Sequence, residues 1–356
     1  MLSTFYNHFY EGMNYRLRSV AEGRWADHCR PVVPLFLLTE RCNARCLHCD
    51  IWKNRGKEDS PTLDQWKTVV SDLRDWLGPV QVVFTGGEVL LKSYTIDLVT
   101  FAASVGLLVE ILTHGYWEDQ STIERLVRAR PWKITISVDG VGELHSKIRG
   151  REKFWERTGR TIETIKRLRA EKHLKTVLRL KCVIMSHNLD SVCDVARFAN
   201  HPGMEVFFQP IEQNYNTIED PRWWEHTGNW PRDTDKAVQA VMRLIQMKQA
   251  GLRIANSYEQ LDVMIPYFRN PDAMRVMTQS HQAHEHKPIC TALTGLQFQA
   301  NGDVTTCYSQ PPVGNIKSAR IRHIWEQRPQ WWKFGCCLER RLTQAEKQEL
   351  SLPVPS

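Results

Sequence analysis

The sequence predicts an α/β fold in which a parallel sheet is covered by helices. Six apolar runs alternate along the chain with segments of helical periodicity, and the runs are almost continuously apolar. Such runs indicate strands that are buried on both faces, as in parallel sheets joined by crossover helices. A barrel and a doubly wound open sheet both produce this pattern, so periodicity alone does not choose between them.

The predicted elements follow one another from the N-terminus. Residues 1–30 are rich in Tyr, Phe and Arg and predict one or two short amphipathic helices. The six predicted strands span 32–38, 80–85, 107–113, 133–139, 177–185 and 204–210. Helical patterns fall between them near 62–77, 93–105, 120–130, 160–172 and 188–200. Residues 216–289 then predict an ordered, Trp-rich loop followed by an amphipathic helix near 234–250.

Composition excludes several classes of protein. The chain has 356 residues, of which 42% are apolar and 24% charged, so a large folded core is expected rather than disorder. The net charge of +7 arises from scattered Lys and Arg among 40 acidic residues, which does not indicate a nucleic-acid surface. The start of the chain has no signal-peptide core, and no stretch is long and apolar enough for a membrane span, so we expect a cytoplasmic protein.

Ten cysteines are present, and seven of them form two groups. The first group, Cys42, Cys46 and Cys49, has CxxxCxxC spacing and follows the first predicted strand. One loop with this spacing supplies three thiolates to a four-iron cluster and leaves the fourth iron without a protein ligand. A zinc site is the alternative, but zinc sites in proteins mostly use CxxC pairs and four closed ligands. The grouping also favours a reducing compartment over a disulfide framework.

This cysteine motif resembles the signature of the radical S-adenosylmethionine (radical SAM) superfamily, with His48 before the last cysteine. The resemblance implies a partial (β/α)6 TIM-like barrel, which periodicity did not decide. It also implies a [4Fe–4S] cluster that binds S-adenosylmethionine (SAM), with His48 among the cofactor-binding residues. In such barrels the chemistry lies at the C-terminal ends of the strands, and the cysteine loop follows the first strand as this rule requires.

Gly86, Gly87 and Glu88 end the second predicted strand and resemble the GGE motif that holds the amino group of SAM in the family. A double glycine lets backbone approach a ligand closely. The resemblance implies that Glu88 pairs with the SAM ammonium, whereas in isolation Glu88 would be a solvated carboxylate at a helix start. The third strand ends in Thr113 and His114, where many relatives have Thr-Asn, so this position departs from the family pattern.

Ser137 ends the fourth predicted strand, and Arg149 follows twelve residues later. This resembles the family pattern in which the serine contacts the SAM ribose and the arginine its carboxylate. A guanidinium offers a planar two-pronged donor that suits a carboxylate. The alternative is that Arg149 is a surface residue between Lys147 and Arg151.

The fifth predicted strand alternates between a face with Arg179 and Lys181 and a face with Leu180 and Cys182. The sequence does not say which face is the barrel interior. We interpret Cys182 as a small buried side chain rather than a hydrogen-atom donor. The polar and aromatic residues 207–215 after the sixth strand are expected to contact substrate.

The second cysteine group consists of Cys290, Cys307, Cys336 and Cys337. The spacing resembles the opening of the SPASM/twitch domain, because eleven residues separate Cys290 from Gly302 and four separate Gly302 from Cys307. The pair Asn301-Gly302 predicts a hairpin between these two cysteines. The resemblance implies one auxiliary iron–sulfur cluster. Cys336 and Cys337 are adjacent, so one or both are ligands, and a zinc site with four cysteines is the alternative.

These resemblances divide the chain into five parts. They are an N-terminal helical extension at 1–30, the barrel at 31–215, a connecting helical segment at 216–289, a SPASM/twitch-like domain at 290–340 and a C-terminal tail at 341–356. The chemistry they imply is reductive cleavage of SAM to a 5′-deoxyadenosyl radical, which abstracts a substrate hydrogen. An electron donor such as flavodoxin or ferredoxin would supply the electron.

Two kinds of substrate agree with this chemistry, a small molecule that is oxidised or epimerised and a ribosomal peptide. The N-terminal segment before the barrel is shorter than a leader-peptide-binding domain, which favours a small molecule. No catalytic residue besides the cofactor ligands is identified from the sequence. The competing class is a non-catalytic, zinc-stabilised binding protein.

Overall fold

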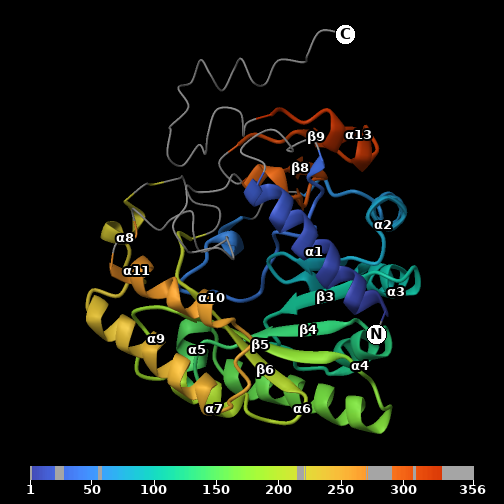
Figure 1. The fold of residues 1–356 in the computed structure, drawn as a ribbon. Coiled ribbons are helices and arrows are strands. Elements are labelled where there is room, and N and C mark those ends of the chain that lie inside the picture. The colour runs from blue at the N-terminus through green and yellow to red at the C-terminus, as the bar shows by residue number, and fades with distance from the viewer. Residues whose placement is uncertain are drawn as a thin grey trace.

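The computed structural model describes residues 2–20, 28–54, 58–214, 220, 222–269, 271, 291–307 and 310–330 (Figure 1). The strands are β1 (Leu35–Leu37), β2 (Gln81–Thr85), β3 (Leu108–Thr113), β4 (Lys133–Ser137), β5 (Val177–Ile184), β6 (Met204–Pro210), β7 (Gln297–Phe298), β8 (Asp303–Thr305) and β9 (Gly314–Asn315). The α-helices are α1 (Leu2–Val20), α2 (Leu63–Leu77), α3 (Thr95–Ser104), α4 (Ser121–Arg128), α5 (Glu143–Arg149), α6 (Phe154–Glu171), α7 (Val192–Phe198), α8 (Trp223–His226), α9 (Thr234–Gln249), α10 (Tyr258–Asp262), α11 (Met264–Arg269) and α13 (Ile321–Glu326). Short 3-10 helices span Ile51–Lys53 (η2), Val89–Leu91 (η3) and Thr291–Leu293 (η5).

The strands form one sheet in the order β6-β5-β4-β3-β2-β1-β7-β8-β9. Strands β1 to β6 are parallel and lie beside their sequence neighbours throughout. A doubly wound sheet reverses its strand order at a switch point, whereas a barrel is wound in one direction. The sequential order therefore agrees with the expected partial barrel, and all six predicted strands are confirmed.

The two faces of the sheet differ in polarity, and this answers the question that the sequence left open. On β5, Leu178, Leu180 and Cys182 are fully buried in the core that the helices share. The opposite, inner face carries Arg179 and Lys181, and the register sets Lys181 beside the last residue of β4. Cys182 is thus a buried core residue, as predicted, and the barrel interior is polar.

Helix boundaries follow local signals in the sequence. Thr62 and Gln65 form a capping box at the start of α2, and Gly78 ends that helix at φ 84°. The helical patterns predicted between the strands correspond to α2, α3, α4, α6 and α7. Helix α5, which ends at the expected anchor Arg149, was not predicted.

Within the described residues of the N-terminal segment, 2–20 and 28–30, one helix is present, α1, which lies across the start of β2. The first N–H of β2, at Gln81, donates to Asn7 Oδ1 at 2.7 Å, and the Tyr6 hydroxyl donates to the Leu77 carbonyl. The helix thereby satisfies backbone groups at the N-terminal end of the sheet. No helix in the described part of the chain has the length and apolarity needed to cross a membrane.

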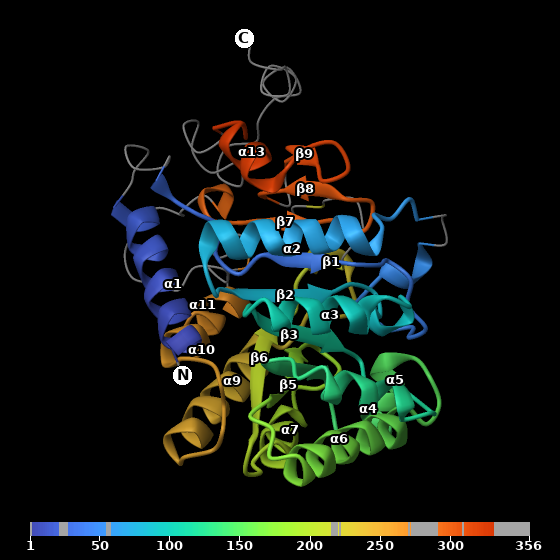
Figure 2. The same cartoon turned by 90° about the vertical axis from the view of Figure 1, so that its right-hand side faces the viewer.

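The predicted hairpin around Asn301 and Gly302 is confirmed, because β7 and β8 pair antiparallel across it. Gly302 has φ +91°, and a Cβ there would lie 2.9 Å from Pro61 Cγ, so both conformation and space require glycine. The sequence did not predict that β7 also pairs in parallel with β1. The C-terminal strands thus extend the barrel sheet (Figure 2), while the predicted domain boundaries remain predictions.

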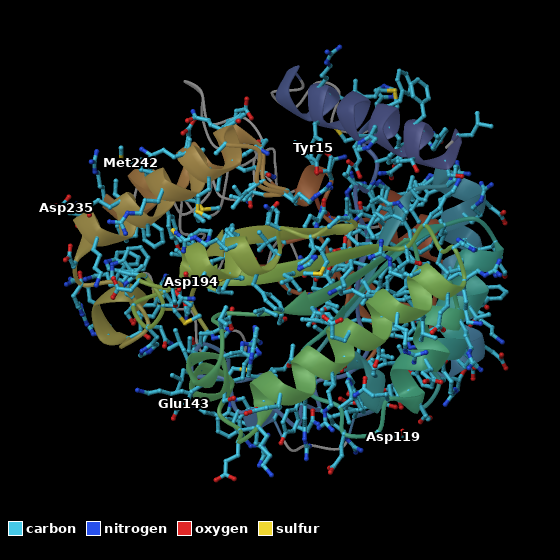
Figure 3. The ribbon with its side chains drawn as sticks, turned by 90° about the horizontal axis from the view of Figure 1, so that it is seen from below. Tyr15, Asp119, Glu143, Asp194, Asp235 and Met242 are labelled. Atoms are coloured by element: carbon cyan, nitrogen blue, oxygen red, sulfur yellow. The ribbon has the colours of Figure 1, made fainter. Side chains whose placement is uncertain are left out.

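Phe298 holds this extension to the barrel, which gives a stability prediction. Its ring is fully buried, with its centroid 4.4 Å from Phe36 and 6.1 Å from Trp66. Phe298→Ala should lower the free energy of unfolding by about 3–5 kcal/mol, measured by urea denaturation, because a buried cavity forms. Met242→Ala is the control, since Met242 is 48% exposed on α9 (Figure 3). Equal midpoints for the two variants would contradict the proposed anchoring role.

Candidate functional site

The three cysteines of the first group come together in one small apolar cluster. Cys46 is buried with Ala44 and Phe154, and Cys42 and Cys49 pack against this cluster from its edge. Burial raises the pKa of Cys42 to about 12 and that of Cys49 to about 11. As free thiols they are therefore neutral, and ionising them requires nearby positive charge of the kind that a bound metal centre supplies.

The N-terminal half of the cysteine loop is fixed to the end of β2. The N–H of Gly87 donates to the Thr39 carbonyl, and the N–H of Glu88 donates to the Arg41 carbonyl, both at 2.8 Å. A Cβ on Gly86 would lie 2.3 Å from the Thr39 oxygen, and one on Gly87 would lie 2.4 Å from the Arg41 oxygen. The double glycine therefore lets two segments of backbone meet without side chains between them.

The other half of the loop is fixed to the end of α5. The N–H groups of Arg45 and Leu47 donate to the carbonyls of Arg149 and Ile148, each at 3.0 Å. Gly150 ends α5 at φ +66°, and a Cβ there would lie 2.2 Å from the Arg45 oxygen. We call these four backbone bonds, two to residues 87–88 and two to residues 148–149, the loop clamp.

Arg149 is buried and reaches the cysteines, so it is not the surface residue of the alternative interpretation. One guanidinium nitrogen, Nη1, donates to Cys46 Sγ at 3.6 Å, and the other, Nη2, lies 2.7 Å from Asp139 Oδ2. Burial raises the pKa of Asp139, but Arg149 and His48 outweigh it and hold that pKa below the usual value. A buried, ionised pair therefore adjoins the cysteine cluster.

Asp139 is the residue that sequence reasoning missed. It follows β4, is fully buried, and accepts a hydrogen bond from the Val183 N–H at 3.0 Å. The Nε2 atom of His48, from the cysteine loop, lies 3.9 Å from Asp139 Oδ2. Burial lowers the pKa of His48 to about 4, so this imidazole is neutral at pH 7. The sequence feature that could have identified Asp139 is its position as a carboxylate directly after a buried strand.

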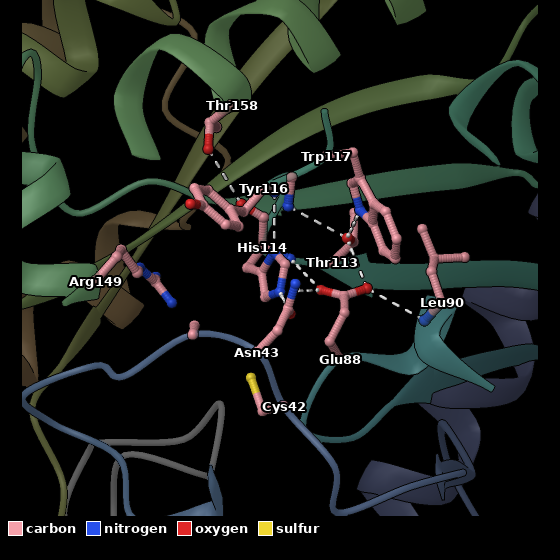
Figure 4. Close-up of polar contacts among 12 residues, drawn as sticks. Cys42, Asn43, Glu88, Leu90, Thr113, His114, Tyr116, Trp117, Arg149 and Thr158 are labelled. Carbon is pink, nitrogen blue, oxygen red and sulfur yellow. Dashed lines mark hydrogen bonds and ion pairs between the residues drawn. The ribbon is translucent and has the colours of Figure 1, made fainter. Parts of the chain in front are cut away.

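Glu88 is enclosed rather than solvated (Figure 4). Its Oε1 accepts from the Thr113 hydroxyl at 2.9 Å and from the Leu90 N–H at 3.2 Å, and its Oε2 accepts from the His114 N–H at 2.9 Å. Burial raises the pKa of Glu88 to about 7, although these hydrogen bonds oppose the rise. The side chain has no exposed surface, so the carboxylate does not line an open site in this arrangement.

Two predicted site residues offer unused polar atoms. The Nε of Arg149 is buried without a hydrogen-bond partner. Ser137 is half-buried at the end of β4, beside Lys181 of β5, and its hydroxyl has no hydrogen bond to any residue that the structure describes. A free guanidinium N–H suits a carboxylate and a free hydroxyl suits a ribose, so the donor set fits the polar groups of SAM.

The second cysteine group is described only at Cys307, which is buried just after β8. Cys290, Cys336 and Cys337 lie outside the described residues. Across the described part of the chain, no three His, Cys, Asp or Glu side chains are arranged around one metal-ion position. The ligand set of an auxiliary cluster therefore stays a prediction.

Comparisons with known proteins agree with the geometry. Residues 36–179 match the family model of the Radical SAM superfamily. The AdoMet-dependent heme synthase of Methanosarcina barkeri (strain Fusaro / DSM 804) is 23% identical over 81% of this chain and 80% of its own length. The sporulation killing factor maturation protein SkfB of Bacillus subtilis (strain 168) is 27% identical over 51% of this chain and 42% of its own length.

A solved structure shares the fold. The crystal structure of Streptococcus suis SuiB bound to S-adenosylmethionine superposes with a TM-score of 0.62 at 15% identity, and covers 86% of this chain and 68% of SuiB. Members of the superfamily use a [4Fe–4S] cluster together with SAM, and homologues with SPASM domains carry auxiliary clusters. The matching family model, the barrel and the clustered cysteines together show that residues 36–179 form a domain of the Radical SAM superfamily and that the chain is a radical SAM enzyme.

Proposed function

We propose that this enzyme abstracts a hydrogen atom from a small-molecule substrate, in a reaction such as oxidation or epimerisation. The observation that carries the SAM site is the contact of Arg149 with Cys46, which places a guanidinium with an unused Nε–H beside the cysteine cluster. Bound together, the cluster and SAM supply a 5′-deoxyadenosyl radical after one-electron reduction. The remaining steps depend on residues of the chain itself.

Cys42, Cys46 and Cys49 hold the cluster, and the loop clamp keeps their loop against β2 and α5. Arg149 binds the carboxylate of SAM, and Asp139 keeps the guanidinium charged and oriented in its buried setting. Ser137 binds the ribose, and the backbone at Gly86 and Gly87 adjoins the amino group. These contacts would orient SAM through its carboxylate, its ribose and its amino group.

Aromatic side chains exclude water from the same site. Tyr116 stacks on Phe154 with ring centroids 4.5 Å apart, and both rings pack in the cluster that contains the cysteines. A dry site protects a reactive radical from side reactions. His48 adds a neutral imidazole beside Asp139.

The inner face of the barrel supports a small, anionic substrate. Two inner cations have carboxylate partners, since Arg179 lies 2.6 Å from Glu205 and Lys133 lies 3.6 Å from Glu110. Lys181 lies level with Ser137, and burial lowers its pKa although the charge of Glu212 opposes this. An anionic group on the substrate would further stabilise the charged form of Lys181.

The share of each relative's length that aligns with this chain also supports a small-molecule substrate. The heme synthase, whose name refers to a small molecule, aligns over 80% of its length, whereas SkfB aligns over 42%. Maturation of a ribosomal peptide is the second candidate, because SkfB is a maturation protein and SuiB shares the fold. A zinc-stabilised binding protein loses its basis, because the chain is a radical SAM enzyme.

We further propose one auxiliary cluster held by Cys290, Cys307 and one or both of Cys336 and Cys337. An electron donor such as flavodoxin or ferredoxin would reduce the radical SAM cluster. Cys42 and Cys49 are partly exposed, and keeping such ligands reduced requires a reducing compartment, so we propose that the enzyme acts in the cytoplasm.

Cys46→Ala should abolish formation of 5′-deoxyadenosine from SAM under anaerobic, reducing conditions, because the cluster loses one of three ligands. Cys42→Ala and Cys49→Ala should behave in the same way. The matched control is Cys193→Ala, since Cys193 lies on α7 outside the cluster of cysteines and should leave the reaction intact. Chromatographic quantification measures the product. Normal formation in the Cys46 variant would rule out the assigned cluster.

Arg149→Lys should raise the dissociation constant of SAM by roughly ten- to a hundredfold, as expected for a lost hydrogen bond to a charged group. Lysine keeps the charge but not the two-pronged donor. Equilibrium dialysis on iron-loaded protein measures the effect. Lys147→Ala, an exposed change on the same helix, is the control and should bind like the wild type. Wild-type affinity in the Arg149 variant would contradict the carboxylate contact.

Wild-type protein should carry about eight irons per chain if both clusters contain four irons. A triple alanine variant of Cys42, Cys46 and Cys49 should retain about half of this iron in the C-terminal cluster. Adding Cys307→Ala should remove the remainder, as measured by metal analysis. Single replacements of Cys336 and Cys337 then identify which one is a ligand. Zinc without iron in the triple variant would exclude an auxiliary iron–sulfur cluster.

A further inference from the structure

The carboxylate of Glu88 is enclosed by hydrogen-bond donors from its own chain. The three donors described above occupy three of the roughly four acceptor positions of an ionised carboxylate. Nε2 of His114 lies 3.2 Å from Oε2 of the same carboxylate (Figure 4). Since the side chain also has no exposed surface, these contacts hold Glu88 in the protein rather than at an open site.

His114 lies between Glu88 and the cysteine loop. Its Nδ1 accepts a hydrogen bond from the Tyr116 N–H at 2.9 Å, so the ring proton is assigned to Nε2. That nitrogen lies 2.6 Å from Asn43 Oδ1, closer than it lies to Glu88. Burial lowers the pKa of His114 to about 3, so the ring is a neutral donor.

Asn43 belongs to the cysteine loop and directly follows Cys42. Its side chain accepts from His114, and its backbone carbonyl accepts from Arg151 Nε at 2.9 Å. The loop clamp acts on residues 39, 41, 45 and 47 and does not include Asn43. Side chains fix the loop there instead, since Arg45 and Arg151 donate to its carbonyls and His114 holds the Asn43 side chain.

We propose that Glu88 acts through His114 and Asn43 as a positioning residue for the cysteine loop, and does not itself bind the amino group of SAM. The inference rests on the proposed SAM site but changes the role that the GGE resemblance implies for Glu88. It also assigns a purpose to His114, which stands where many relatives have asparagine. From the end of β3, the histidine donates a hydrogen bond through Nε2 to Asn43 of the cysteine loop.

The test compares SAM dissociation constants and the paramagnetic resonance signal of the reduced cluster in iron-loaded, full-length variants. His114→Ala, Asn43→Ala and Glu88→Gln should each weaken SAM binding by about tenfold and alter the signal, since each breaks the same chain of bonds. The double variant of Glu88→Gln with His114→Ala should be no weaker than the single variants within about twofold, because interacting residues are not additive. His114→Gln should retain near-wild-type binding, because its amide nitrogen replaces Nε2.

Direct binding by Glu88 predicts a different pattern. Removing His114 would then free the carboxylate, so His114→Ala would bind SAM as well as the wild type while Glu88→Gln would not. That result would overturn the inference. So would additive effects in the double variant, or an equal loss of SAM binding in His114→Gln and His114→Ala. If His114→Ala fails to load iron, Asn43→Ala decides, and wild-type binding by that variant would overturn it.

The control is His201→Ala, an exposed histidine far along the chain, which should match the wild type in both measurements. The outcome also separates this inference from the proposed function. A wild-type protein that binds no SAM would overturn both, whereas wild-type binding with independent effects of Glu88 and His114 would overturn the positioning role alone.

Discussion

The structure of the site depends on the loop clamp, the four backbone hydrogen bonds that hold the cysteine loop between the end of β2 and the end of α5. These bonds require close backbone approach, which explains glycine at positions 86, 87 and 150. Because each end of the loop is fixed to a different β/α unit, the spacing of the three cysteines depends on correct closure of the barrel. Folding and cofactor binding are therefore linked through main-chain geometry.

The clamp has an electrostatic consequence. Fixing the loop to α5 brings the Arg149 guanidinium against Cys46 in a buried environment, where an isolated charge would be costly. Asp139 balances this charge from the end of β4. On the far side, neutral His114 and the enclosed Glu88 provide hydrogen bonds without a free charge. The cysteines thus have an ionic partner on one side and neutral support on the other.

The sequence predicted the parts of this account that depend on local pattern. Strand runs, cysteine spacing and the Asn301-Gly302 turn each lie within a short segment, and the structure contains the predicted strands and hairpin. Contacts between distant segments were not predictable from one sequence. The pairing of β7 with β1, the bond of Asp139 with Arg149 and the burial of Glu88 depend on how separate β/α units close upon each other.

The central claim is that three cysteines leave one iron of a four-iron cluster free to bind SAM. Mössbauer spectroscopy of the ⁵⁷Fe-labelled Cys307→Ala variant tests this most directly, because that variant should contain the radical SAM cluster alone. We predict that adding SAM changes the signal of about one iron in four and leaves the rest unaltered. A four-iron spectrum that SAM does not change, or a protein that holds zinc in place of iron, would contradict it.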